Sequence, residues 1–242
     1  MVRIFCPCPL IYSKRGFDHT RQNRFAYLIA GSTVFERDIL CLRYLLQNAW
    51  AFEVTVCQEA EKEMQDQHFH QWVSEVSTAA ANNGVVAWLV ASGHGSQRGN
   101  EIYLKPSEDA SMGSCIQLSK WWVFLHGKLP PTSLLIVFAD MCLVGPGQGW
   151  KNLTLPKRGV EHFFMFSGQM GRPSYHNSNF SWFTEEFVEQ GWNAQAGKDI
   201  NDFFADVAKQ VYITARENNR VQQPKKRSSL GKLKLVLKTC AI

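Results

Sequence analysis

Two residues of reactive type each follow a long apolar run in this chain. His94 stands between two glycines in the stretch SGHG, just after the run VVAWLVA, and Cys142 lies two positions after the run SLLIVFAD. A histidine that removes the proton from a neighbouring thiol produces a thiolate, which attacks carbonyl carbons. The same imidazole then returns the proton to a leaving amine. If His94 and Cys142 meet in the fold, these two residue types suit the cleavage of an amide bond.

The glycines beside the histidine fit the same chemistry. Gly95 has no side chain, so its backbone can approach a substrate closely, and we expect its N–H and that of Cys142 to donate to a developing oxyanion. One such donor is typically worth roughly 3 kcal/mol of barrier. The alternative is a structural role, because a single histidine near a strand end and a free cysteine are both common in folded proteins. The pair is more informative than either residue alone, since both follow predicted central strands.

Apolar runs alternate with helical patterns along the chain. Continuously apolar or β-branched runs predict strands, and apolar residues at three- and four-residue spacing predict amphipathic helices. The predicted strands cover residues 24–31, 52–58, 85–92, 101–106, 133–140, 161–168 and 232–237. The predicted helices cover residues 36–50, 59–81, 118–125, 179–191 and 199–218, the fourth ending at Gly191.

This order of elements predicts an α/β protein of three layers, with a mostly parallel central sheet and helices on both faces. In such sheets, ligands bind beyond the carboxyl ends of the strands. His94 follows the predicted strand 85–92, and Cys142 follows the predicted strand 133–140. If these strands are neighbours, we expect both residues at one edge of the sheet, with His94 held by a loop.

The bulk composition fits one domain. The chain has 242 residues, 45% of them apolar, which is enough for one sizeable core. Residues 1–23 predict a mobile N-terminal arm, and no linker divides residues 24–242, which we expect to form a single domain. The seven cysteines show no paired metal-site spacing and therefore predict reduced thiols. Because no signal peptide or membrane-spanning run is recognisable, we expect a cytoplasmic protein that does not bind membranes.

The basic character is concentrated at one end of the chain. The net charge is +5, but residues 218–242 hold seven Lys and Arg and no acid, which leaves −2 for the rest. We expect a solvated tail beside a last edge strand. The alternative is a binding segment for acidic partners, nucleic acid or anionic lipid. Because the rest of the chain is mildly acidic and has no nucleic-acid motif, nucleic-acid binding is not expected.

The two reactive motifs together resemble those of the caspase-like cysteine peptidases, peptidase family C14. ASGHG precedes ADMCLVG by the spacing of that family, with 48 positions from His94 to Cys142. The stretch FMFSGQMGRPSYHNSNFSWFTEEFVEQ also resembles the start of the family's small subunit. The resemblance implies a three-layer caspase-like fold and a catalytic dyad of His94 and Cys142. It divides the domain into a large-subunit-like part, residues 24–150, and a small-subunit-like part, residues 159–242.

Within this family, the chain is more similar to metacaspases and paracaspases than to animal caspases. Asp140, Cys142 and Gly145 match the metacaspase pattern D-x-C-x-x-G, whereas caspases have Gln at the first of these positions. In metacaspases this aspartate, another on the first helix and the serine of SGHG line the pocket for the residue before the cleaved bond. The resemblance therefore implies that Asp38, Ser92 and Asp140 form this S1 pocket.

A carboxylate at the bottom of a narrow slot favours a guanidinium or ammonium group and repels a substrate aspartate. We therefore expect cleavage after Arg or Lys, with Arg preferred for its bidentate geometry. For Asp38 the alternative is structural, because a carboxylate in the first turn stabilises a helix.

The resemblance also bears on regulation. Lys157 and Arg158, in the stretch LPKRGV, would suit self-cleavage by a basic-specific enzyme, and a solvated loop is the alternative. Many metacaspases depend on Ca²⁺, but no acidic cluster in this sequence marks a calcium site. Ca²⁺ therefore rests on the resemblance alone, no metal ligand is assigned, and no other cofactor is expected. Either a monomer or a homodimer formed through an exposed edge strand fits the family.

The sequence therefore predicts a cysteine endopeptidase that cuts protein or peptide substrates after Arg or Lys through an acyl-enzyme. The alternative is a catalytically silent caspase homologue that acts as a scaffold or regulator. Leu143 and Val144 favour that alternative, because metacaspases usually continue from the cysteine with His-Ser. Both predicted catalytic residues are nevertheless present, and silent homologues usually lose one of them.

Overall fold

The computed structural model describes residues 22–143, 159–168, 173–177, 179–194 and 199–229, and the backbone of two short strands near the termini. An eight-stranded sheet forms its centre, with six strands in the order β3-β2-β4-β7-β8-β9. These six strands are β2 (Asn23–Ala30), β3 (Glu53–Cys57), β4 (Val85–Arg98), β7 (Leu134–Met141), β8 (Glu161–Phe166) and β9 (Lys225–Ser228). β2, β3, β4, β7 and β8 pair in parallel, and β9 pairs antiparallel with β8.

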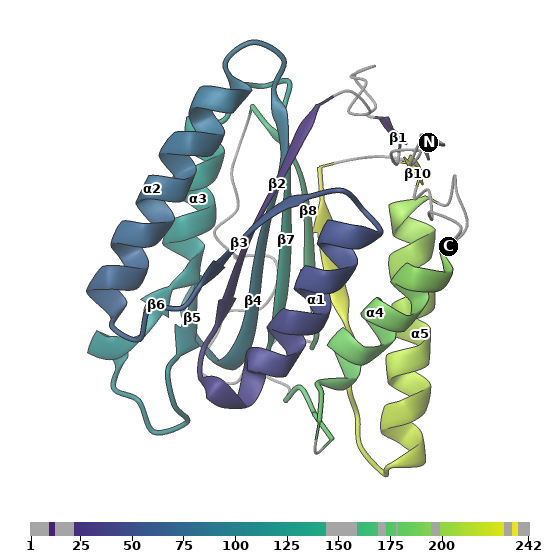
Figure 1. Ribbon diagram of the computed structural model, residues 1–242. Helices are drawn as coiled ribbons and strands as arrows, with labels where there is room; N and C mark the ends of the chain where they lie inside the picture. Colours follow the sequence, from purple (N-terminus) through teal and green to yellow (C-terminus); the bar gives the residue numbers. More distant parts are fainter. Residues whose placement is uncertain are drawn as a thin grey trace, which may run out of the picture.

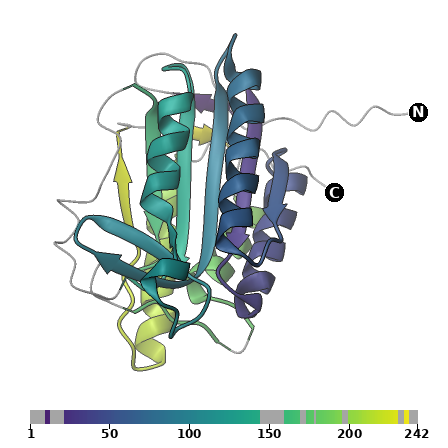
Figure 2. The same ribbon diagram turned by 90° about the vertical axis from the view of Figure 1, so that its left-hand side faces the viewer.

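Helices cover both faces of this sheet, as Figure 1 and the turned view in Figure 2 show. On one face lie α1 (Glu36–Asn48), α4 (Trp182–Asn193) and α5 (Ile200–Glu217), and on the other lie α2 (Lys62–Ala80) and α3 (Leu118–Lys128). β5 (Glu101–Lys105) pairs antiparallel with the end of β4 and with β6 (Ile116–Gln117). The predicted α/β class, with three layers and a mostly parallel sheet, is confirmed.

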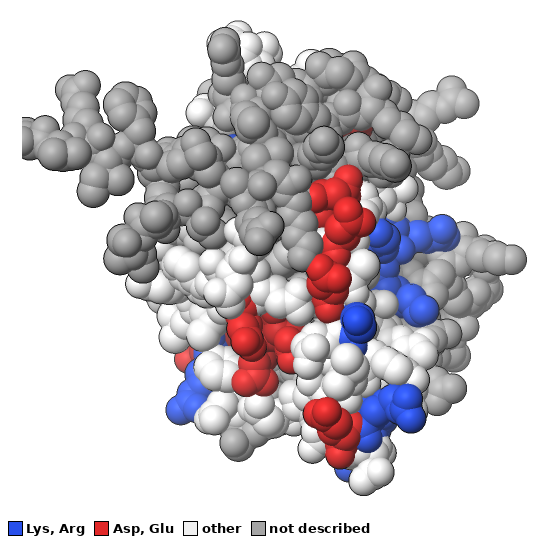
Figure 3. All heavy atoms as spheres, turned by 90° about the vertical axis from the view of Figure 1, so that its right-hand side faces the viewer, with Lys and Arg blue, Asp and Glu red and all other residues white. Residues whose placement is uncertain are grey.

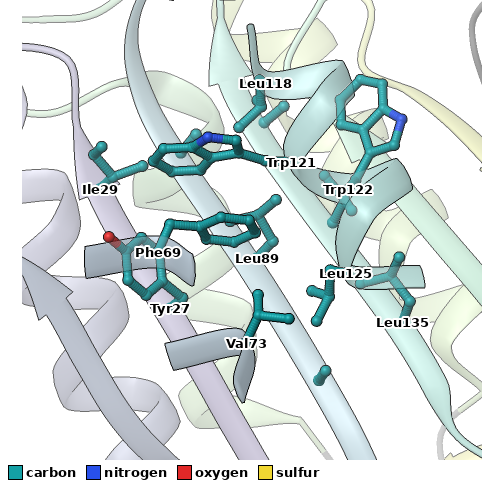
Figure 4. Packing of buried hydrophobic residues seen from close by; sticks show 14 of the residues in the cluster. Tyr27, Ile29, Phe69, Val73, Leu89, Leu118, Trp121, Trp122, Leu125 and Leu135 are labelled. Atoms are coloured by element: carbon teal, nitrogen blue, oxygen red, sulfur yellow. The ribbon is translucent and has the colours of Figure 1, made fainter. Parts of the chain in front are cut away.

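Side chains of the central strands alternate between two separate cores. On β2, Leu28 packs toward α1, α4 and α5, whereas Tyr27 and Ile29 pack toward α2 and α3. Figure 4 shows the second core, where Phe69 of α2 and Trp121 of α3 stack with ring centroids 4.2 Å apart. Both faces are apolar because helices cover both, which is why the strands read as continuous apolar runs in the sequence.

One predicted helix end was wrong. α4 continues past Gly191 to Asn193, so this glycine lies inside the helix and not beyond its end. A Cβ at Gly191 would lie 2.7 Å from Leu45 Cδ2 and 3.2 Å from Trp50 Cζ2. The glycine therefore lets α4 pack closely against α1, and this tertiary requirement overrides the usual preference of glycine for helix ends.

The two terminal segments pair with each other. β1 (Leu10–Tyr12), which lies within the predicted mobile arm, runs antiparallel to β10 (Lys234–Val236). β10 falls inside the strand predicted at residues 232–237. The basic stretch that precedes it, residues 225–228, forms β9 at the edge of the main sheet. The sequence alone predicts a solvated tail for these residues. Edge strands tolerate charged side chains, so their composition resembles that of a loop.

The face of the molecule toward α4 and α5 carries charges of both signs. Acidic side chains form a line on this face, with basic side chains beside it (Figure 3). The exposed charged residues of these two helices include Glu185, Glu189, Asp202, Asp206 and Lys209.

Within the described part of the chain, no helix is long and apolar enough to cross a membrane.

Candidate active site

His94 and Cys142 lie at the same edge of the sheet. β4 and β7 are parallel neighbours, and the last residue pair in register is Gly93 opposite Met141. His94 and Cys142 are the next residues of these two segments, just beyond the stretch over which β4 pairs with β7. The strand order thus brings together the two residue types that the sequence singled out, at the edge where parallel sheets hold their ligands.

The prediction that a loop holds His94 was wrong. β4 continues to Arg98, and its final part pairs antiparallel with β5, with His94 opposite Lys105. The strand exchanges one neighbour for another here because its backbone N–H and C=O groups still need partners where β7 ends. His94 is therefore held on a strand that is paired along its length, which fixes the backbone below the imidazole more firmly than a loop would.

The two glycines around His94 allow close contact with neighbouring backbone. A Cβ at Gly93 would lie 2.7 Å from Leu104 Cδ1 and 3.0 Å from Gly31 Cα. A Cβ at Gly95 would collide with the carbonyl oxygen of Cys142 and would lie 2.8 Å from Met141 Cβ. Gly95 and Cys142 are therefore immediate neighbours in space. That their two N–H groups form an oxyanion hole stays a prediction.

The imidazole of His94 lies in a half-buried environment that keeps it neutral. The ring of Phe35 meets it edge-on, with centroids 5.0 Å apart. Burial lowers the pKa of His94, the charge of Glu108 raises it, and the charges of Lys105 and His176 lower it further. A neutral imidazole is the form that can accept a proton from a thiol.

The thiol of Cys142 interacts with the segment that follows β8. Its Sγ lies 3.4 Å from the carbonyl oxygen of Ser174, to which it donates, and accepts from the Ser174 N–H at 3.2 Å. Burial raises the pKa of Cys142, and so do the charges of Asp140 and Glu108, while the Ser174 N–H lowers it. The resting cysteine is therefore a protonated thiol. It must lose its proton to a base before it can act as a nucleophile.

Asp38 and Ser92, two residues of the predicted S1 pocket, are hydrogen-bonded to each other. Ser92 Oγ donates to Asp38 Oδ2 at 2.8 Å, and the backbone N–H of Ser181 donates to Asp38 Oδ1 at 3.1 Å. Asp38 is only 2% exposed. Burial raises the pKa of Asp38 to about 7, with the charge of Asp140 as the next cause.

Asp140, the third predicted residue, interacts electrostatically with Asp38 and is held by hydroxyl groups. Thr184 Oγ1 donates to Asp140 Oδ2 at 2.6 Å, and Ser174 Oγ lies 3.4 Å from Asp140 Oδ1. Asp140 is also 2% exposed, and burial raises its pKa. Two buried carboxyl groups so close cannot both ionise easily, so near neutral pH the pair retains part of a proton.

Four residues at this site escaped the sequence reasoning. Gln222 donates from Nε2 to the carbonyl of Ser167 at 3.0 Å and to Ser174 Oγ at 3.1 Å, and its Oε1 accepts from the Tyr175 N–H at 2.9 Å. It thereby ties the segment that touches Cys142 to the end of β8. Ser181 and Thr184 lie at the start of α4. The only usable signal in the sequence was Ser181 itself, because serine is a preferred residue at the N-cap of a helix. Nothing in the local sequence marks Gln222 or Ser174.

Several predicted features fall outside the described residues. These are Val144 and Gly145 after the cysteine and the predicted self-cleavage residues Lys157 and Arg158. Among the described residues, no group of three or more His, Cys, Asp or Glu side chains could hold a metal ion.

Comparisons with known proteins agree with this fold. The caspase domain family, peptidase C14, matches residues 30–234. The search of curated proteins found no match. Among solved structures, the crystal structure of caspase-1 from Spodoptera frugiperda is similar, with a TM-score of 0.64 and 17% sequence identity over 90% of this chain and 91% of that one.

At this identity the structural match concerns the fold alone, but the family match spans most of the chain and includes both His94 and Cys142. The central sheet with helices on both faces is the architecture that this similarity predicts. The chain therefore belongs to the caspase domain family of cysteine peptidases, peptidase family C14.

Proposed function

We propose that this protein is a cysteine endopeptidase that cleaves after Arg or Lys, with Cys142 as nucleophile and His94 as general base. The observation that carries the proposal is the pairing of β4 and β7, which brings the histidine and the cysteine to one edge beside two buried carboxyl groups. The basic specificity and the dyad are the parts of this proposal that go beyond family membership.

The reaction begins with proton transfer. Cys142 turns from the Ser174 backbone toward His94, whose neutral imidazole takes the thiol proton, and the thiolate attacks the substrate carbonyl. The oxyanion accepts from the N–H groups of Gly95 and Cys142. The imidazolium gives its proton to the leaving amine, which leaves an acyl-enzyme on Sγ. Water, activated by His94, then releases the acid and the free thiol.

Specificity follows from the carboxyl pair. A substrate guanidinium that reaches Asp38 and Asp140 replaces the present hydroxyl partners, such as Ser174 Oγ, and completes the ionisation of both groups. A substrate aspartate would add a third negative charge and is rejected. Because burial raises the pKa of Asp38 to about 7, cation binding requires loss of its proton. The kcat/KM for Arg substrates should therefore rise as the pH passes upward through about 7.

The test is a set of fluorogenic peptides that differ only in the residue before the cleaved bond, assayed with and without Ca²⁺. We expect release after Arg, weaker release after Lys, none after Asp, and none from the Cys142→Ala variant. The calcium arm decides whether the metal dependence of many metacaspases extends to this chain. Release after Asp in preference to Arg would refute the assignment of Asp38 and Asp140.

One observation favours the scaffold alternative. In the resting structure the thiol of Cys142 is protonated and donates a hydrogen bond to the carbonyl of Ser174. If this arrangement never opens, the chain keeps the caspase fold without turnover. Absence of Cys142-dependent release from every peptide, at every calcium level, would identify the protein as such a scaffold.

The same specificity extends to self-cleavage at Lys157 or Arg158. Mass analysis of purified wild-type protein should show two fragments that are absent from Cys142→Ala. An intact chain in an active preparation would remove the idea.

A further inference from the structure

A cavity of about 630 Å³ opens at the carboxyl ends of β2 and β3, beside the start of α1. Part of its wall is aliphatic, from Ile39, Leu40, Val56 and Pro106, and polar side chains form much of the rest. The polar part of the lining includes two carboxylates, Glu36 and Glu59, and the lining contains no Lys or Arg among the described residues. The volume lies in the range of sites that bind a side chain or a small molecule.

This cavity adjoins the strand of the catalytic histidine. Gly31, which lines the cavity, donates its N–H to the carbonyl of Ser92 at 2.8 Å. A Cβ at Gly31 would lie 3.3 Å from Gly93 Cα and 2.7 Å from the carbonyl oxygen of Lys105. Gly93 precedes His94, and Lys105 is the residue of β5 that pairs with His94. One wall of the cavity, at Gly31, therefore packs directly against the backbone that carries His94.

The strand order gives a direction to the site. Across the sheet edge lie the cavity at β3 and β2, His94 on β4, Cys142 after β7, and then Ser174, which Gln222 ties to the end of β8. In thiol peptidase chemistry the acyl part stays on the sulfur, while the imidazole protonates the departing amine. The departing segment therefore leaves on the histidine side, and that side leads to the cavity.

We propose that this cavity binds a lysine or arginine side chain of the substrate segment that departs with the amine. The inference rests on the proposed endopeptidase function and deepens it. The aliphatic walls accommodate the methylene stem, and Glu36 and Glu59 attract the cationic end. Ser32 also lines the cavity, and its buried Oγ has no hydrogen-bond partner among the described residues, so a change of its rotamer would let it bind the backbone of the bound segment.

The experiment uses pairs of internally quenched peptides with Arg before the cleaved bond. The two members of a pair carry either lysine or acetyl-lysine at the first, second or third position after that bond, and mass spectrometry confirms the cut after Arg. At one of these positions we expect the lysine peptide to have a kcat/KM about tenfold higher, because two exposed carboxylates contribute modestly to binding a cation.

The protein variants identify the carboxylates responsible. Glu36→Gln combined with Glu59→Gln should reduce the ratio between the two peptides to near one. Glu53→Gln is the matched control, since Glu53 is an exposed glutamate at the opposite end of β3, and it should keep the wild-type ratio. Reading a ratio within each variant removes any general effect of the substitutions on the rate.

The outcomes separate the two proposals. Cleavage after Arg with a ratio of one at all three positions overturns the cavity assignment and leaves the proposed function standing. If the double variant keeps the wild-type ratio between the lysine and acetyl-lysine peptides, the cavity assignment is likewise overturned and the proposed function stands. Absence of any Cys142-dependent cleavage overturns both proposals together.

Discussion

The two faces of the sheet differ in the ionisable groups that they bury. On the α2 and α3 face, two buried aromatic side chains carry polar atoms that find partners: Tyr27 Oη forms a hydrogen bond with His68 Nδ1 at 3.0 Å, and Trp121 Nε1 donates to Asp66 Oδ1 at 2.7 Å. On the α1 and α4 face, the carboxyl groups of Asp38 and Asp140 are themselves only 2% exposed.

This difference fits the proposal that the aromatic face stabilises the fold and that the carboxyl pair recognises the substrate. Burying a carboxyl group costs free energy, and hydroxyl partners only partly offset the lost hydration. The raised pKa values of Asp38 and Asp140 are the sign of that cost. Strained or costly groups of this kind concentrate at functional sites. The α2 and α3 face, by contrast, has the aromatic packing of a structural core (Figure 4).

The largest expected effect is on the structural face. Trp121→Ala removes the ring that stacks on Phe69 and should lower the free energy of unfolding by roughly 3–5 kcal/mol. Urea denaturation measures the loss. Val123→Ala, an exposed change on the same helix, should stay within about 0.5 kcal/mol of wild type. Equal effects of the two substitutions would show that this face does not carry the stability assigned to it.

Asp140→Asn should lower activity without lowering stability, in contrast to Trp121→Ala. Removing the buried charge should leave the free energy of unfolding unchanged or raise it, because the desolvation cost disappears. The kcat/KM for Arg peptides should fall about 100-fold, or about 2.7 kcal/mol, since the substrate cation loses its partner. Asp202→Asn, on the exposed side of α5, is the control. Full activity of Asp140→Asn would refute the pocket assignment.

Gln222→Ala should lower both the free energy of unfolding and kcat, by smaller amounts than the changes above. Gln222 is fully buried, and its loss leaves the Tyr175 N–H and the carbonyl of Ser167 without their partner, at a cost of roughly 2 kcal/mol in stability. Because the Ser174 segment also loosens, kcat should fall while Gln223→Ala retains the wild-type value. A normal kcat in a stably folded Gln222→Ala would remove the positioning role.

Per pH unit, the smallest effect is the pH dependence that Asp38 adds to the free energy of unfolding. Its pKa is about 7 in the folded protein and about 3.9 in an unfolded chain, so between these values the folded state holds the extra proton. The stability it contributes is complete below about pH 4 and is lost as the pH rises to about 7, with a slope of at most about 1.4 kcal/mol per pH unit.

Denaturation of wild type and Asp38→Asn at pH values from 4 to 8 isolates this term. The variant should show a smaller decline than wild type over this interval, because Asp140 is then the only one of the two buried carboxyl groups that still titrates there. Parallel curves for the two proteins would mean that Asp38 titrates as an exposed carboxylate does.

The sequence was sufficient to predict the elements whose apolar residues form a continuous run or recur at helical spacing. The strands of 24–31, 85–92 and 133–140 appear because burial on both faces demands continuous apolar residues. The sequence could not show that β4 continues past His94. That part of β4 pairs with the antiparallel strand β5 through backbone hydrogen bonds, which leave no hydrophobic pattern in the sequence. Ser174 and Gln222 were missed for a related reason, since their bonds join segments that are 48 residues apart.

The central claim concerns the dyad and the carboxyl pair together, and one paired assay tests it. Two peptides identical except for arginine or its uncharged analogue citrulline before the cleaved bond are given to wild type, His94→Gln and Cys142→Ala. We predict that wild type cleaves the arginine peptide at least about 100-fold faster than the citrulline peptide, a difference of about 2.7 kcal/mol, and that neither variant cleaves either one. Equal rates on the two peptides, or cleavage that survives the loss of Cys142, would contradict the account.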